Sequence, residues 1–268
     1  MTNAPRPTRF AGESWRTASA MHARVVGAVI MRDLQTRFGA GYFGFLLGLL
    51  MPLGHLGIVI TVSTLIQHAS PIGTDRPIFL MTGVLPFIIW LYSHRQIMTT
   101  LSYNRPLLFF PGVDIFDLFL SRIVIELLNS TIIVIVVISA MTIVGYDVHA
   151  YKWPDFIYGL ILAWALGLGT GLFFGSLTSI MPLAIMFGLI LGPLMWATSG
   201  IFFLPDGLPE SLQKILYFNP LSHVVDGVRL SYFSEYSSDF FNSTFLYIFI
   251  VSAIAVSLAL TAAIRRVA

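Results

Sequence analysis

The chain has 268 residues, of which 56% are hydrophobic and only 10% are charged. Ordinary soluble domains carry about 25% charged residues, so a chain this apolar cannot cover a water-facing surface, and its composition indicates a membrane protein. A formal net charge of +2 without a basic run argues against a nucleic-acid partner, and the lack of cysteine excludes disulfides and thiolate metal sites.

The segment 24–38 predicts an amphipathic helix in the membrane interface. Apolar side chains recur there every four positions from Val26 onward. Asp33 and Arg37 stand four residues apart, which suits a helical ion pair, but this pair falls close to the apolar row. We therefore expect protein, and not lipid alone, to cover part of the helix.

Residues 39–268 predict one all-α transmembrane domain with six spans. A span needs about 20 apolar residues, and the stretch from Phe156 to Pro205 has no charged residue and is long enough for two, with Pro182 at the turn. The expected spans are about 42–67, 77–94, 115–144, 156–180, 183–203 and 240–264.

The distribution of basic residues predicts that both termini are cytoplasmic. Six spans place the two ends on one side, and that side then holds eleven of the 15 basic residues, as the positive-inside rule requires. Residues 1–23 are accordingly expected to be a cytoplasmic segment, because they lack the compact apolar core and cleavage site of a signal peptide.

The fourth expected span has a small residue at every fourth position, and the fifth repeats the pattern in part. Such residues let helix backbones approach closely in lipid. Tight packing inside the bundle is favoured over a dimer seam. The positions are Gly159, Ala163, Gly167, Gly171, Gly175 and Ser179, then Ala184, Gly188 and Gly192.

The loop after the second span is long enough to form a short helix before Pro106 and the Pro111-Gly112 pair break the chain. Two interpretations remain open for its tip at Tyr103, Asn104 and Arg105. It is either a docking surface for a soluble partner or an ordinary connector that rests on lipid headgroups.

The segment 204–240, on the outer side of the membrane, predicts two short helices that form a re-entrant hairpin. The hairpin is broken at Asn219-Pro220, and Ser222 is the expected N-cap of its second helix. His223, Asp226 and Arg229 follow at intervals of three. Catalysis is disfavoured, because no G-x-S-x-G elbow or separate oxyanion site accompanies them. An ion pair between Asp226 and Arg229 that locks the hairpin is the simpler interpretation.

Two isolated polar positions are expected inside the membrane. His55 is the lone ionisable residue of the first span and is interpreted as a core histidine whose polar groups are satisfied. Glu126 stands four residues after Arg122, so these two are expected to pair. The two lysines, Lys152 and Lys214, do not stand in a P-loop, so any ATP hydrolysis is expected on another chain.

These segments together resemble type-2 ABC exporter permeases, in particular the capsular polysaccharide export (KpsM-like) branch. "RDLQTRFG" from Arg32 and "MPL" from Met51 are similar to the start of that family, and "SGIFF" from Ser199 to the end of its fifth span. "NPLSHVVDGVR" from Asn219 is similar to its motif before the last span, with Asp where Glu is common. The resemblance begins near Arg24 and covers nearly all of the chain after it.

The resemblance implies a homodimer that binds a separate ABC ATPase dimer, with ATP and Mg²⁺ on that partner and no cofactor or metal here. A periplasm-spanning export protein is a further expected partner. The loop at Ser102, Tyr103, Asn104 and Arg105 would dock the ATPase. Asn219, Pro220, His223, Asp226 and Arg229 would belong to a periplasmic gate.

The expected substrate is a lipid-linked capsular polysaccharide that is moved across the bacterial inner membrane. Alternatives are a permease for O-antigen, teichoic acid or a small amphiphile, or a secondary transporter. Aromatic faces stack on sugars, although a lipid-facing or interfacial position is favoured for any single aromatic residue. Arginines attract acidic groups, and anchoring to lipid headgroups is equally open for them. The candidates are Arg37, Tyr42, Phe45, Trp90, Tyr92, Arg95, Phe187 and Trp196.

Overall fold

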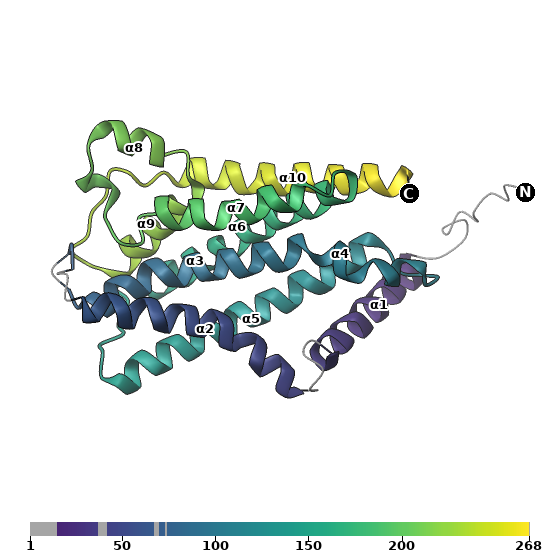
Figure 1. Ribbon diagram of the computed structural model, residues 1–268, viewed down its shortest axis with the longest axis horizontal. Helices are drawn as coiled ribbons and strands as arrows, with labels where there is room; N and C mark the ends of the chain where they lie inside the picture. Colours follow the sequence, from purple (N-terminus) through teal and green to yellow (C-terminus); the bar gives the residue numbers. More distant parts are fainter. Residues whose placement is uncertain (1–14, 37–41, 67–69, 73, 268) are drawn as a thin grey trace, which may run out of the picture.

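A computed structural model describes residues 15–36, 42–66, 70–72 and 74–267 of the chain, and this part is helical without strands (Figure 1). The expectation of an all-α fold is therefore confirmed. The helices are α1 Trp15–Thr36, α2 Tyr42–Leu65, α3 Arg76–Met98, α4 Thr100–Asn104, the 3-10 turn η1 Arg105–Phe109, α5 Ile115–Val144, α6 Trp153–Ile180, α7 Ala184–Thr198, the 3-10 turn η2 Pro205–Gly207, α8 Glu210–Leu216, α9 Pro220–Tyr232 and α10 Ser243–Val267.

Five of the described helices are long and apolar enough to cross a membrane, namely α2, α3, α5, α6 and α10. Helix α7 is apolar but has only 15 residues, which corresponds to about 22 Å of helix. A hydrocarbon core is about 30 Å thick. The fifth expected span, 183–203, is thus shorter than the sequence suggested, because the chain leaves the helix at Ser199 and turns at Gly200, where φ is +73°.

Helix α3 forms the centre of the bundle, and α6 lies against it through its small residues. A Cβ atom on Gly167 would stand 2.8 Å from the carbonyl oxygen of Trp90, and one on Gly171 would stand 2.9 Å from Ile97 Cβ. The stripe on α6 therefore serves packing inside one chain, as the sequence predicted. On α7, Ala184, Gly188 and Gly192 are the buried residues.

The ends of the bundle differ. Figure 1 shows the long helices running roughly side by side, with α8 and α9 at one end and α4 at the other. The end of α10 and the start of α1 lie at the α4 end. Helix α1 starts earlier than expected, at Trp15, and packs on α5, where Val26 and Val29 are buried. This agrees with the expectation of a helix partly covered by protein.

The two short helices at the other end are broken where the sequence suggested, but the cap differs. The N-cap of α9 is Asn219, whose side chain accepts a hydrogen bond from the Leu221 N–H, so the prediction of Ser222 was wrong. Pro220 occupies the first turn of α9, where its missing N–H has no consequence. Ser222 lies inside the helix and donates to the Asn219 carbonyl.

Candidate functional site

Arg229 on α9 is completely buried and holds the segment that follows α7. Its Nη1 donates to the carbonyl oxygens of Gly200 at 2.6 Å and Phe203 at 3.1 Å, and its Nη2 donates to that of Ile201 at 2.9 Å. The guanidinium carbon also lies 4.1 Å from the ring centroid of Phe79 on α3. Charge-assisted hydrogen bonds are the strong ones, so Arg229 ties three parts of the fold together.

His223, one turn earlier on α9, connects α8 to the approach to α10. Its Nε2 lies 2.8 Å from the Tyr217 carbonyl oxygen, and its Nδ1 accepts the Asn242 N–H at 3.2 Å. These two bonds require the neutral imidazole with its proton on Nε2. Its ring also stacks on Phe240. Burial lowers the pKa of His223, although the hydrogen bond to the Tyr217 carbonyl acts in the opposite direction.

Asp226 binds the loop between α9 and α10. Its Oδ1 accepts a hydrogen bond from the Tyr236 hydroxyl, and its Oδ2 accepts one from the Ser238 hydroxyl, both at 2.5 Å. Burial raises the pKa of Asp226, although both hydroxyls favour the charged form. The loop is therefore folded back onto α9.

The expected ion pair between Asp226 and Arg229 was wrong, since neither residue forms an ion pair within the described part of the chain. Each side chain instead fixes a different neighbouring segment. The geometry also does not support catalysis, because the Ser222 hydroxyl donates to the Leu216 carbonyl rather than to His223. The three polar residues fix α9 to the neighbouring segments at this end of the bundle.

The opposite end presents an exposed tip formed by α4 and η1. Tyr103 is 76% exposed and Phe109 is 86% exposed, and Ser102 and Arg105 are exposed beside them. Asn104 differs because it is buried. Large exposed aromatic side chains gathered on a short segment are typical of a surface that binds another protein.

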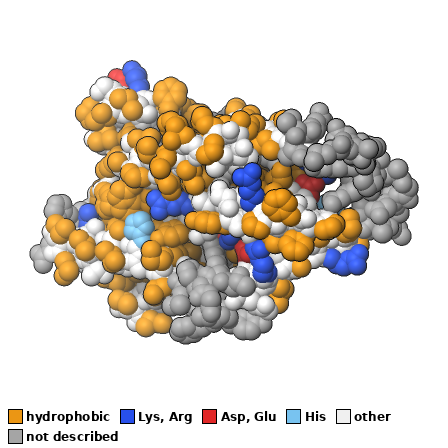
Figure 2. Space-filling view, turned by 45° about the vertical axis from the view of Figure 1, so that its right-hand side comes forward, with side chains coloured by type: hydrophobic (Ala, Val, Ile, Leu, Met, Phe, Trp, Pro, Cys, Tyr) orange, Lys and Arg blue, Asp and Glu red, His pale blue; other side chains and the backbone are white. Residues whose placement is uncertain are grey.

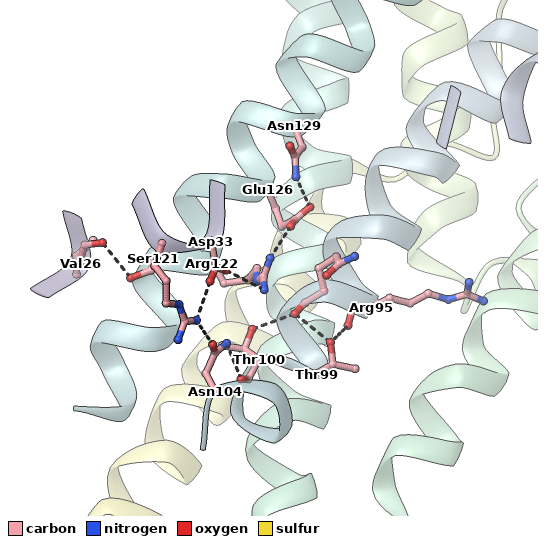
Figure 3. A network of polar contacts seen from close by, with 12 residues as sticks. Val26, Asp33, Arg95, Thr99, Thr100, Asn104, Ser121, Arg122, Glu126 and Asn129 are labelled. Atoms are coloured by element: carbon pink, nitrogen blue, oxygen red, sulfur yellow. Dashed lines mark hydrogen bonds and ion pairs between the residues drawn. The ribbon is translucent and has the colours of Figure 1, made fainter. Parts of the chain in front are cut away.

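A polar network joins this tip to α1 and α5 (Figure 3). Asn104 accepts a hydrogen bond from Arg32 on α1, and Arg32 also binds Asp33 at 2.7 Å. Arg122 on α5 binds the other oxygen of Asp33 at 3.1 Å. Figure 3 shows Asp33 and Arg122 facing each other between the two helices, with Asn104 below them. The tip is thus connected to α5 through α1.

The network continues along α5. Arg122 lies 3.5 Å from Glu126, which confirms the pair expected from the sequence, and Asn129 donates to the second carboxylate oxygen at 3.1 Å. The pair expected between Asp33 and Arg37 is not tested, because Arg37 lies outside the described residues. Asp33 is satisfied by Arg32 and Arg122 instead.

Several of the sequence candidates for a substrate path lie around α7. Trp196 is partly buried, and its ring contacts those of His55 on α2 at 5.3 Å and Phe87 on α3 at 4.8 Å. His55 has these ring contacts and no hydrogen bond to another described residue, so the expected satisfaction of its polar groups is not seen. Phe187 is 54% exposed on α7. Three other candidates have undescribed side chains: Arg37, Tyr42 and Phe45.

Trp90 stacks on a residue that the sequence did not single out, His94. His94 is completely buried and lies 3.0 Å from both the Thr170 hydroxyl on α6 and the Gly188 carbonyl oxygen on α7. It therefore ties α3 to two neighbours. In the sequence, His94 stands at the end of an apolar run, and this position indicates only the edge of a membrane span. The described residues contain no group of three or more potential metal ligands.

Comparison with known proteins identifies relatives over most of the chain. The model of the ABC-2 type transporter family matches residues 24–233. The chain is 29% identical to the polysialic acid transport protein KpsM of Escherichia coli, over 88% of this chain and 91% of that protein. It is 27% identical to the capsule polysaccharide export inner-membrane protein CtrC of Neisseria meningitidis, over 81% of this chain and 82% of the relative. For BexB of Haemophilus influenzae, with the same description, the identity is 24%, over 83% and 84%.

Proposed function

The chain belongs to the ABC-2 type transporter family, and from this premise we propose that it is the permease subunit of an ATP-driven exporter of capsular polysaccharide in the bacterial inner membrane. The observation that carries the proposal is the similarity to three capsule and polysialic acid export proteins over more than four fifths of the chain. The apolar helices supply the membrane domain.

We propose that ATP is hydrolysed by a separate partner, which docks on the tip formed by α4 and η1. The sequence has only two lysines, and neither stands in a P-loop. The aromatic side chains of Tyr103 and Phe109 at the tip supply contact area, and Arg105 supplies charge. In this arrangement the α4 end is cytoplasmic and the α9 end is periplasmic.

The proposal extends to two copies of the chain with a canal near their interface, closed on the periplasmic side by α8 and α9. Exposed apolar side chains on α2, such as Leu50, Met51 and Ile58, are 64–70% exposed and are available to lipid or to a second copy. The bonds of Arg229, His223 and Asp226 give α9 the rigidity that a gate requires.

Deletion followed by complementation tests the proposed function. Cells that lack the chain should accumulate capsular polymer in the cytoplasm, and the wild-type gene should restore export. The variant Arg105→Glu should insert in the membrane but capture less ATPase in a pull-down, because it reverses a charge on the exposed tip. The matched control is Lys214→Glu on exposed α8, which reverses a charge at the opposite end. Normal ATPase capture by Arg105→Glu would refute the docking assignment.

A further inference from the structure

Arg95 is a cation inside the apolar bundle, and the described residues supply no hydrogen-bond or ion-pair partner for it. Its side chain is partly buried, and its Nε is buried without a hydrogen-bond partner among the described residues. Figure 3 shows it pointing away from the polar network that occupies Asp33, Arg122 and Glu126. Arginine inside a membrane is costly and normally pairs or lines a pathway.

The guanidinium lies against α7, well inside that helix. A Cβ atom on Gly192 would stand 3.0 Å from Arg95 Nη2 and 3.1 Å from Leu91 Cδ1, so the glycine leaves room for the arginine. Gly192 is eight residues past the start of α7, which places it about 12 Å along the helix axis. Arg95 therefore reaches up from the α4 end into the bundle.

Three helices around Arg95, namely α2, α3 and α7, have no carboxylate to neutralise this charge, and Glu126 on α5 is already bound by Arg122 and Asn129. The sequence contains neither Asp nor Glu between Asp33 and Asp75, between Asp75 and Asp114, or between Asp155 and Asp206. Helices α2, α3 and α7 are therefore free of acid over their whole length. A second copy of the chain that packed along these helices would also bring no acid, so dimerisation through them leaves Arg95 unpaired.

Aromatic rings continue from Arg95 toward the α9 end. Phe87 stands eight residues before Arg95 on α3, and its ring contacts Trp196, whose ring in turn lies 5.3 Å from that of Phe202. Figure 2 shows a largely apolar face of the molecule on which basic side chains, a few acidic side chains and a histidine are also exposed. Phe87 is buried, so the rings accessible to a ligand are those of Trp196, which is partly exposed, and Phe202, which is exposed. A cation followed by such ring faces is suited to a sugar chain that carries acidic groups.

We propose that Arg95 binds an anionic oxygen group of the substrate, a sugar carboxylate or phosphate, and thereby selects an acidic polysaccharide. This inference rests on the proposed export function and goes beyond it, because it names a residue and a charge class for the substrate. The missing counter-ion of Arg95 is then supplied by the polymer during passage.

Binding of charged and neutral sugar oligomers tests the inference. The full-length chain in complex with its ATPase, held in phospholipid nanodiscs, is titrated with a sialic acid oligomer, a phosphodiester-linked sugar oligomer and a neutral glucose oligomer of equal length. Arg95→Gln should weaken binding of at least one acidic oligomer at least tenfold and leave the neutral one unchanged. Arg95→Lys should retain part of the affinity, because it keeps the charge but not the planar fork.

Two controls separate binding from folding. Lys214→Gln removes the same charge from exposed α8 and should change neither affinity. The melting temperature of Arg95→Gln should be unchanged or higher, because an unpaired cation has been removed. Unchanged affinity of Arg95→Gln for both acidic oligomers, or an equal loss for acidic and neutral ones, overturns the inference.

A third measurement separates the polymer from membrane lipid, which also carries phosphate. The titration is repeated in detergent freed of phospholipid, and the effect of Arg95→Gln should persist. An effect seen only with phospholipid assigns the guanidinium to a headgroup and overturns the inference. If the complex exports polymer but binds charged and neutral oligomers with equal affinity, only the role of Arg95 is refuted. If the chain captures no ATPase and supports no export, the proposed function is refuted.

Discussion

Arg229 donates to the carbonyl oxygen of Gly200, 29 residues earlier in the chain, at 2.6 Å. The carbonyl is presented by a residue with φ of +73°, a conformation that favours glycine. Space for the guanidinium is left by Gly83 on α3, where a Cβ atom would stand 3.0 Å from Arg229 Nη2. Two glycines and one arginine thus join α3, α9 and the end of α7.

Replacing Arg229 by methionine, of similar length, should destabilise this end of the bundle. Three backbone carbonyls lose a charged donor while they remain buried, and such bonds contribute about 1.5–3 kcal/mol each, so we expect a loss of about 3 kcal/mol or more. Thermal unfolding in detergent measures the loss. Lys214→Met on exposed α8 is the control. Equal melting temperatures for Arg229→Met and the wild type would show that the carbonyls find other partners.

His223 should make the hairpin less stable in mild acid. Burial lowers the pKa of His223, so the folded state favours the neutral ring. The contribution of the neutral ring to the stability of the fold is therefore fully present above the ordinary histidine pKa of about 6.5. As the pH falls through the lowered folded pKa, protonation of Nδ1 removes the acceptor for the Asn242 N–H and the stabilisation is lost. Melting temperatures between pH 8 and pH 5 measure this, with His223→Gln as the non-titrating control. The same slope in both proteins would contradict the prediction.

Asn104→Ala should uncouple ATP hydrolysis from export while docking persists. Asn104 is buried and does not form part of the exposed tip, but it accepts a hydrogen bond from Arg32, which connects the tip to Asp33 and Arg122. We expect normal capture of the ATPase, retained hydrolysis and export reduced severalfold. Ser102→Ala, on the exposed side of the same helix, is the comparison. A parallel loss of capture and export would place Asn104 in the docking surface instead.

Gly167→Ala and Gly57→Ala should have opposite consequences. The new methyl group at 167 would stand 2.8 Å from the Trp90 carbonyl oxygen, so α3 and α6 must separate at a cost of about 1–3 kcal/mol. A methyl group at 57 meets nothing within 4 Å, and alanine favours a helix over glycine by up to about 1 kcal/mol. Thermal unfolding of the two variants compares them directly. A tolerated change at 167 would show that the helix contact is loose.

The sequence predicted most of the long helices because burial in lipid demands length and apolarity, which a single chain displays directly. The glycine stripe on α6 was also predicted, because its period fixes one face of a helix. The short α7 was not, since the apolar run extends past Ser199 and only the turn at Gly200 reveals where the helix ends. Likewise, Ser222 was expected as the cap of α9, but the helix begins earlier, at Pro220, and Asn219 caps it.

The candidate sites, too, were predicted from the sequence only in part. Composition and apolar runs indicated a membrane protein, and the Asn219 motif and the lack of a P-loop led to the proposal of a permease with a separate ATPase, because each is a property of residues close in sequence. The pair of Arg122 and Glu126, within one helix, was predicted from the sequence, whereas tertiary structure decided the partners of the polar residues on α9. The spacing of Asp226 and Arg229 allowed a local ion pair, but each bonds a distant segment, since buried polar groups take whichever partners the packed helices bring within reach.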